Sequence, residues 1–168
     1  YHFLDKFIFT HILYLIYRYY MISKKTKYGL NAVIYLAKKF DKGAVLISDL
    51  AEDEKLPKKF LEAILLELKN RGILQSKKGK GGGYTLAKSQ KEITIGEIVR
   101  ALEGPLAPVS CVSQTAYQKC EECKDERCCG IRFVMKEVRD AISNILDKRT
   151  LADVIEQIHN AQGSQHMN

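Results

Sequence analysis

The chain has 168 residues, of which 46% are hydrophobic and 28% are charged. This length fits one compact domain with appended elements, and this composition excludes a disordered or fibrous protein. The formal net charge is +7. Clustered cations gain free energy by releasing counterions from phosphates, so this positive charge favours a polyanionic partner. A generic solvated basic surface would give the same net charge.

Residues 1–20 are rich in aromatic and aliphatic side chains, but Lys6, His11 and Arg18 interrupt them. The apolar stretches are too short to span a bilayer, so we interpret the segment as a leader outside the functional body, with an additional packed helix as the alternative. No secretory signal pattern is present, and the cysteines number five, which is odd. We therefore expect a cytoplasmic protein with reduced thiols and no membrane partner.

Residues 21–104 have the pattern of a winged helix-turn-helix domain. Apolar residues recur at helical spacing after Ser23, Ser48 is placed to cap a short helix over 49–54, and Pro57 is placed to open a longer helix that ends at Gly72. The stripe expected to be buried on the longer helix consists of Leu61, Ile64, Leu65 and Leu68. A short helix, a tight turn and a longer helix form the helix-turn-helix arrangement.

Two strand-like runs follow, at 73–77 and 84–87, and the glycine-rich segment 78–83 separates them. Two such runs around a glycine-rich turn predict a hairpin, or wing. The glycines do not have the spacing of a phosphate-binding loop. Thr94 and Glu97 fit a capping box for a further helix that stops at Gly104. The predicted fold class is therefore mainly α with a small β-hairpin wing, joined to a long dimerisation helix.

Basic residues concentrate on three parts of this domain, which predicts that it contacts the phosphates of double-stranded DNA. Scattered lysines on a solvated face are the alternative. The lysines at the start of the first helix, at the start of the longer helix and on the hairpin are Lys24, Lys25, Lys27, Lys58, Lys59, Lys77, Lys78 and Lys80.

Residues 105–129 hold all the cysteines and show no sustained periodicity, so we interpret them as a sensor loop that becomes ordered on binding a ligand. Thiolates are soft ligands that suit iron-sulfur clusters, zinc or copper(I). Reduced cysteines without any ligand are the alternative. The cysteines are Cys111, Cys120, Cys123, Cys128 and Cys129.

Residues 130–160 are predicted to form a dimerisation helix and a short C-terminal helix, followed by a flexible tail at 161–168. Apolar residues on the first of these helices are spaced as in a heptad seam, which needs a partner; a helix packed on its own domain is the alternative. The seam consists of Ile131, Met135, Val138, Ile142 and Ile145. Thr150 and Asp153 are placed to cap the last helix, from Leu151 to about His159.

The stretches FLEAILLELKNRGIL, SKKGKGGGYTLAK, ITIGEIVRALEG and RTLADVIE, together with the cysteine loop, resemble the Rrf-type family of bacterial winged-helix regulators. The resemblance implies a homodimer on a palindromic operator. It implies that Lys78 stands where the family often places a wing arginine for the minor groove. The positions implied to face base edges are Pro57, Lys59, Glu62 and Ala63.

Cluster-binding members of the family use three loop cysteines and a fourth ligand. Cys111, Cys123 and Cys129 resemble the three, whereas Arg132 and Lys27 stand where relatives place the fourth. Charged Arg and Lys cannot ligate, which leaves Cys120 or Cys128 to complete a site for a two-iron or four-iron cluster, or for zinc.

We therefore predict a DNA-binding transcriptional regulator, with repression expected, that senses redox state, nitric oxide or iron-sulfur status. The alternatives are a cluster-free thiol switch or cysteine-metabolism regulator, and a zinc-stapled structural adaptor. An enzyme is not expected, because the sequence has no nucleophile-base pair, acidic dyad or substrate-pocket motif.

Overall fold

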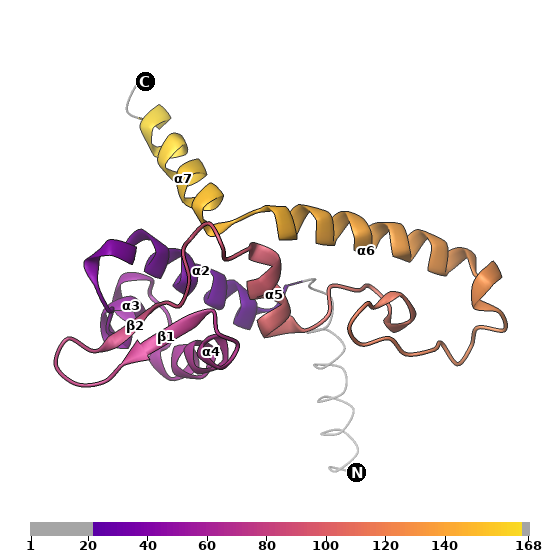
Figure 1. The fold of residues 1–168 in the computed structure, drawn as a ribbon, viewed down its shortest axis with the longest axis horizontal. Helices are drawn as coiled ribbons and strands as arrows, with labels where there is room; N and C mark the ends of the chain where they lie inside the picture. The colour runs from indigo at the N-terminus through magenta and orange to yellow at the C-terminus, as the bar shows by residue number, and fades with distance from the viewer. Residues whose placement is uncertain (1–21, 166–168) are drawn as a thin grey trace, which may run out of the picture.

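The computed structural model describes residues 22–165 of the chain. They form a small helical domain with a two-stranded hairpin, from which a long helix extends (Figure 1). The elements are α2 (Lys24–Lys38), η1 (Phe40–Lys42), α3 (Ile47–Asp53), α4 (Lys58–Asn70), β1 (Leu74–Lys77), β2 (Gly83–Leu86), α5 (Ile95–Glu103), η2 (Ser110–Val112), η3 (Glu126–Cys128), α6 (Gly130–Lys148) and α7 (Leu151–Gln165). The predicted fold class is confirmed.

The core lies between α2, α4 and α5, which each bury one apolar face. The predicted stripe of α4 is confirmed, since Leu61, Ile64, Leu65 and Leu68 are each at most 1% exposed. Burying a leucine or isoleucine side chain stabilises a fold by roughly 1.5–3 kcal/mol, so this stripe fixes how α4 sits on the domain. Its opposite face is left to solvent.

Hydroxyl side chains cap the starts of α2 and α5, of which the Thr94 cap was predicted. Ser23 Oγ accepts from the Thr26 amide at 3.3 Å, and Thr94 Oγ1 accepts from the Glu97 amide at 3.1 Å. The Glu97 carboxylate binds Lys88 Nζ at 2.9 Å, so only half of the expected capping box forms. Gly72, just after α4, has a φ of 72°, the left-handed conformation that glycine adopts without a steric cost.

The start of α3 differs from the prediction. The helix begins at Ile47 rather than Asp49, and Ser48 caps nothing, because its hydroxyl donates instead to the Asp49 carboxylate at 3.0 Å. The physical reason is a backbone pairing just before the helix: Val45 exchanges hydrogen bonds of 3.0 and 2.8 Å with Tyr84 of β2. The extended segment therefore ends at that bridge, and the helix begins directly after it.

The hairpin is antiparallel, with Leu74 opposite Leu86 and Lys77 opposite Gly83. Gly83 lies where the hairpin meets the segment before α3, and its φ is 137°. A Cβ atom at this position would collide with the backbone carbonyl of Val45. The position therefore requires glycine both for its backbone conformation and for its close approach to a neighbouring segment.

We expect Gly83→Ala to destabilise the domain more than Gly81→Ala, a matched change at the hairpin tip. Gly81 has a φ of 72°, but a Cβ atom added there would meet no other atom within 4 Å, so only the backbone cost applies. The collision at position 83 should add roughly 1–3 kcal/mol to the loss of unfolding free energy. Urea denaturation measures both values, and equal losses would show that the contact with Val45 has no energetic weight.

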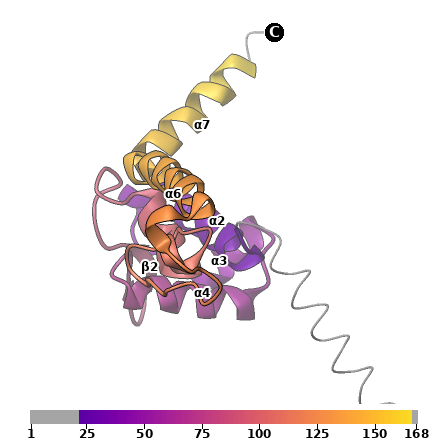
Figure 2. The ribbon, with the colours of Figure 1, turned by 90° about the vertical axis from the view of Figure 1, so that its right-hand side faces the viewer.

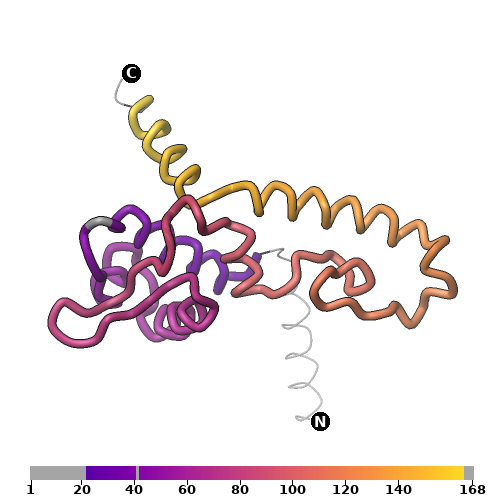
Figure 3. Tube along the Cα trace, in the orientation of Figure 1, coloured from indigo at the N-terminus to yellow at the C-terminus, as the bar shows by residue number. Residues whose placement is uncertain are grey.

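The loop from Gly104 runs out along α6 and then turns into it, as the Cα trace shows (Figure 3). The C-terminal end of α6 is bound to α5 by an ion pair, in which Nη2 of Arg100 lies 2.8 Å from Oδ2 of Asp147. Hydrogen bonding to Arg100 also lowers the pKa of Asp147. The long helix is thus tied to the helical domain at one end and to the cysteine loop at the other.

Helix α7 begins with the predicted reciprocal cap, in which the Thr150 amide donates to Asp153 at 2.8 Å and the Asp153 amide donates to Thr150 at 3.2 Å. It continues to Gln165, beyond the predicted end near His159, so residues 161–165 of the expected tail are helical. Its outer part projects away from the domain (Figure 2). Within residues 22–165, no helix combines the length and apolar character needed to cross a bilayer. The proposed leader, 1–20, lies outside the described residues.

Candidate functional site

The start of α4 presents basic side chains to solvent. Pro57 is the N-cap rather than the first helical residue, and Lys58, Lys59 and Glu62 are exposed, as is Ala63. The first turn of α4 contains no acidic residue. A lysine beside the positive end of a helix dipole destabilises the helix by roughly 0.3–1 kcal/mol. The same placement favours the binding of an anion at this end of α4.

An aromatic contact that the sequence analysis missed steadies this turn. Phe60, 43% exposed, meets Tyr28 of α2 edge to face, with ring centroids 5.8 Å apart and planes at 88°. Such pairs contribute roughly 0.5–1.5 kcal/mol beyond their buried area. The available signal was the position of Phe60, which lies off the buried leucine stripe yet is large and apolar.

The hairpin adds a second basic group on the same side of the domain. Lys77, Lys78 and Lys80 are all exposed, and Gly79 gives the tip between them a left-handed turn with a φ of 86°. Helix α4 and the hairpin both lie along the lower edge of the domain in Figures 1 and 2, whereas α7 leaves from the opposite edge. The fold therefore brings these two predicted lysine groups to one edge.

The lysines of the third basic group, at the start of α2, have two different environments. Lys24 and Lys27 are exposed. Lys25 is bound within the domain, where its Nζ lies 2.6 Å from the Glu67 carboxylate and donates to the Leu102 carbonyl at 3.1 Å. Its charge is already balanced by an acidic neighbour, so we do not place it among the lysines free to contact phosphate.

Helix α6 carries an exposed apolar line along its length. Ile131 is 69% exposed, Val138 38% and Ile145 64%, and Val134, which the predicted seam omitted, is 54% exposed. Met135 and Ile142 are half-buried. The residues of the predicted seam thus differ in exposure, with Ile131, Val138 and Ile145 more exposed than Met135 and Ile142.

Cys111 lies in η2 and is buried, with 8% of its surface exposed. The η2 turn is held on α6 by Arg139, whose guanidinium donates to the carbonyl of Val112. The next turn is closed by Ser113, whose hydroxyl accepts from the Ala116 amide at 3.0 Å. Cys111 is therefore positioned by contacts between the loop and the long helix.

Cys120, Cys123 and Cys129 are half-buried at the start of α6. The Cys123 amide donates to the Cys120 carbonyl at 3.3 Å, which closes a turn. Backbone amides at the open end of α6, chiefly that of Arg132, lower the pKa of the Cys129 thiol, and a hydrogen bond from Cys123 contributes. Partial desolvation and that same hydrogen bond raise the pKa of Cys123. The two thiols therefore lie close enough to influence each other's ionisation.

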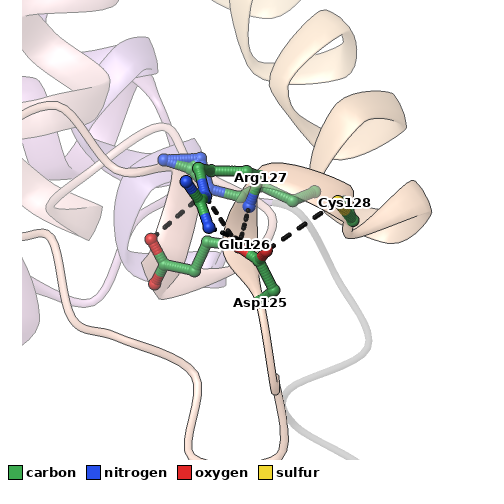
Figure 4. Close-up of polar contacts among 5 residues, drawn as sticks. Asp125, Glu126, Arg127 and Cys128 are labelled. Carbon is green, nitrogen blue, oxygen red and sulfur yellow. Dashed lines mark hydrogen bonds and ion pairs between the residues drawn. The ribbon is translucent and has the colours of Figure 1, made fainter.

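Cys128 lies outside this group. It is exposed, and its sulfur lies 3.8 Å from Asp125 Oδ2, a carboxylate that also caps η3 through the Arg127 amide at 2.9 Å. Figure 4 shows Asp125 linked to both Arg127 and Cys128. The charged surroundings of this cysteine are therefore different from those of Cys123 and Cys129.

A polar cluster adjoins Cys129. The Tyr117 hydroxyl donates to the Glu126 carboxylate at 2.6 Å, which raises the pKa of Tyr117, and Arg132 Nε lies 3.9 Å from the other Glu126 oxygen. Among the described residues, this Nε is buried without a hydrogen-bond partner. An incompletely paired cation beside thiol groups fits an additional anionic group at this place.

Within residues 22–165, no three His, Cys, Asp or Glu side chains converge closely enough to hold a metal ion. Ligand sets commonly assemble only when the metal binds, because bringing thiolates together without it is unfavourable. The donor chemistry of the loop, with thiols and a neighbouring unpaired guanidinium, fits a thiolate-bound group.

Comparison with known proteins agrees with this arrangement. Residues 22–157 match the family model described as "Rrf2: Iron-dependent Transcriptional regulator". An rrf2-like HTH-type transcriptional regulator of Rhodobacter capsulatus is 41% identical over 138 residues, which cover 80% of this chain and 92% of that protein.

Two solved structures share the fold. The global cysteine regulator CymR of Bacillus subtilis superposes with a TM-score of 0.67 at 34% identity, covering 81% of this chain and 96% of that one. IscR of T. potens superposes with a TM-score of 0.67 at 30% identity, covering 84% and 90%. Fold and exposed basic edge define a winged-helix transcriptional regulator. The chain belongs to the Rrf2 family.

Proposed function

We propose that the chain is a sequence-specific repressor that binds a palindromic DNA operator as a homodimer. The observation that carries the proposal is the basic edge: Lys58 and Lys59 of α4 and the hairpin lysines are exposed, and α4 and the hairpin lie along the same edge of the domain. In helix-turn-helix proteins the second helix enters the major groove through its first residues, while flanking cations bind phosphates. Pro57, Lys59 and Glu62 would then face base edges, and Lys78 the minor groove.

The exposed apolar line of α6 supports the dimer. Ile131, Val134, Val138 and Ile145 form a stripe at spacings of three, four and seven residues, which is the geometry by which two helices pack along one seam. A two-fold axis along this seam presents two α4 helices to DNA. An operator with inverted half-sites follows from that symmetry.

The cysteine loop is the proposed sensor. Cys111, Cys123 and Cys129, with a fourth thiolate, would hold a two-iron or four-iron cluster, which supplies a centre whose charge and integrity respond to oxidants and nitric oxide. The family description as iron-dependent supports this. Arg139 joins η2 to α6, so changes at Cys111 are transmitted to the dimer helix and alter the separation of the two α4 helices.

A second candidate is a cluster-free thiol switch. The lowered pKa of Cys129 and its hydrogen bond from Cys123 favour it, because a thiolate next to a second thiol is readily oxidised to a disulfide. The similarity to a cysteine regulator of known structure points the same way. Iron and sulfide analysis with an absorption spectrum of protein purified without oxygen separates the two, and a parallel assay detects zinc.

Replacing Cys111, Cys123 and Cys129 together with serine tests the sensor. We expect the operator affinity of the wild-type protein to differ between oxidised and reduced samples, and that difference to disappear in the triple variant, because its loop can neither bind a cluster nor form the disulfide. Fluorescence anisotropy with labelled DNA measures both. A triple variant that keeps the full redox difference would overturn the role of these cysteines while leaving DNA binding untouched.

A further inference from the structure

The cysteine loop contains two cysteines, Cys120 and Cys123, that share one turn. Cys120 and Cys123 are separated by two residues, and the 3.3 Å hydrogen bond from the Cys123 amide to the Cys120 carbonyl closes the turn between them. Both are half-buried. Two cysteines at this spacing on one turn recur as a chelating pair in zinc and iron-sulfur sites, because the turn lets both sulfurs reach the same centre.

Cys128 is unsuited to join them. Cys128 is the last residue of η3, whereas Cys129 is the N-cap of α6, so the two neighbours belong to different elements. Cys129 is the half-buried member of the two, while Cys128 is exposed and its sulfur contacts Asp125 (Figure 4). The two adjacent cysteines therefore face different surroundings.

We propose that Cys120 is the fourth ligand, so that Cys111, Cys120, Cys123 and Cys129 form an all-thiolate site and Cys128 takes no part. This inference rests on the proposed function of the loop and specifies its ligand set. Ligation is then complete within one loop, and neither Lys27 nor Arg132 needs to contribute. Arg132 is half-buried near Cys129, its buried Nε has no hydrogen-bond partner, and its guanidinium lies where it would balance the charge of four thiolates.

Cobalt(II) titration of the reduced, metal-free full chain tests the assignment, with Cys120→Ser compared with Cys128→Ser as the matched control. The sulfur-to-cobalt charge-transfer band reports how many thiolates bind. We expect C120S to lose about a quarter of the band intensity, since three thiolates replace four. We expect its cobalt affinity to fall by more than about tenfold, because even outer partners of metal ligands contribute that much. C128S should titrate like wild type.

A second measurement needs no variant. Wild-type protein is alkylated with iodoacetamide, with and without Zn²⁺, and the modified cysteines are identified by mass spectrometry. Zn²⁺ should protect Cys120 along with Cys123 and Cys129, while Cys128 is modified in both samples.

Two sets of results would overturn the inference. If C120S titrates like wild type, or if Zn²⁺ protects Cys128 and leaves Cys120 reactive, the ligand assignment is wrong while the metal site stands. If wild-type protein binds neither Co²⁺ nor Zn²⁺ and is purified without iron, the cluster part of the proposed function fails and this inference fails with it. Circular dichroism of both variants checks that they are folded.

Discussion

We expect Lys58→Ala/Lys59→Ala to bind operator DNA at least about 50-fold more weakly than wild type in 0.1 M salt, because the dimer loses the Lys58 phosphate contact of each subunit and each such contact adds about 0.9 to the slope of log affinity against log salt. The contacts of Lys59 with base edges are lost in addition. Both lysines are exposed in the first turn of α4, so the loss should come from the interface rather than from unfolding. Fluorescence anisotropy at several salt concentrations gives the affinity and the slope together.

The matched control removes two other exposed lysines, Lys91 and Lys148. They lie beside the base of α7, where the Ala152 amide donates to the Gln90 carbonyl and the Ile95 amide donates to the Arg149 carbonyl. This edge is opposite to α4 and the hairpin (Figure 1). The net charge of the two variants is the same, so equal losses of affinity would mean that overall charge, and not the α4 surface, determines binding.

Val138→Glu/Ile145→Glu should turn the proposed dimer into a folded monomer. In the single chain these side chains are 38% and 64% exposed, so carboxylates there leave the core intact, whereas across a two-fold seam they would be buried with like charges together. Operator affinity should fall by roughly 10²–10⁴-fold, because the second half-site is no longer held at high effective concentration.

Analytical ultracentrifugation measures the association state of this variant, and circular dichroism checks its folding. Asn144→Asp adds a charge at an exposed position of α6 outside the apolar line and serves as the control. A variant that remains dimeric would move the dimer interface away from this line.

The winged-helix domain was predictable because its signals are local. The α4 stripe repeats at helical spacing, and Ser23, Thr94 and Gly72 act within one turn of the helix ends they mark. The start of α3 was mispredicted for a reason that lies outside the local pattern. The backbone pairing of Val45 with Tyr84, far along the chain, decides where that helix begins.

Side-chain partners in the candidate site were less predictable. Lys25 has the same local pattern as Lys24 and Lys27, yet only Lys25 meets Glu67 across the domain. Met135 and Ile142 fit a heptad seam by spacing, but the spacing does not distinguish them from the more exposed Ile131 and Ile145. The cysteine cluster was evident from its density, whereas the contact of Cys128 with Asp125 depends on the η3 turn.

Selection of bound sequences from a random pool of duplex DNA tests the central claim most directly. A two-fold dimer with a basic α4 on each subunit should enrich an inverted repeat whose half-sites are about 10 base pairs apart, centre to centre. Enrichment should be lost in the variant that lacks Lys58 and Lys59. The account would be contradicted if the wild-type protein enriched no sequence in dilute buffer, or if it enriched only a single unpaired half-site.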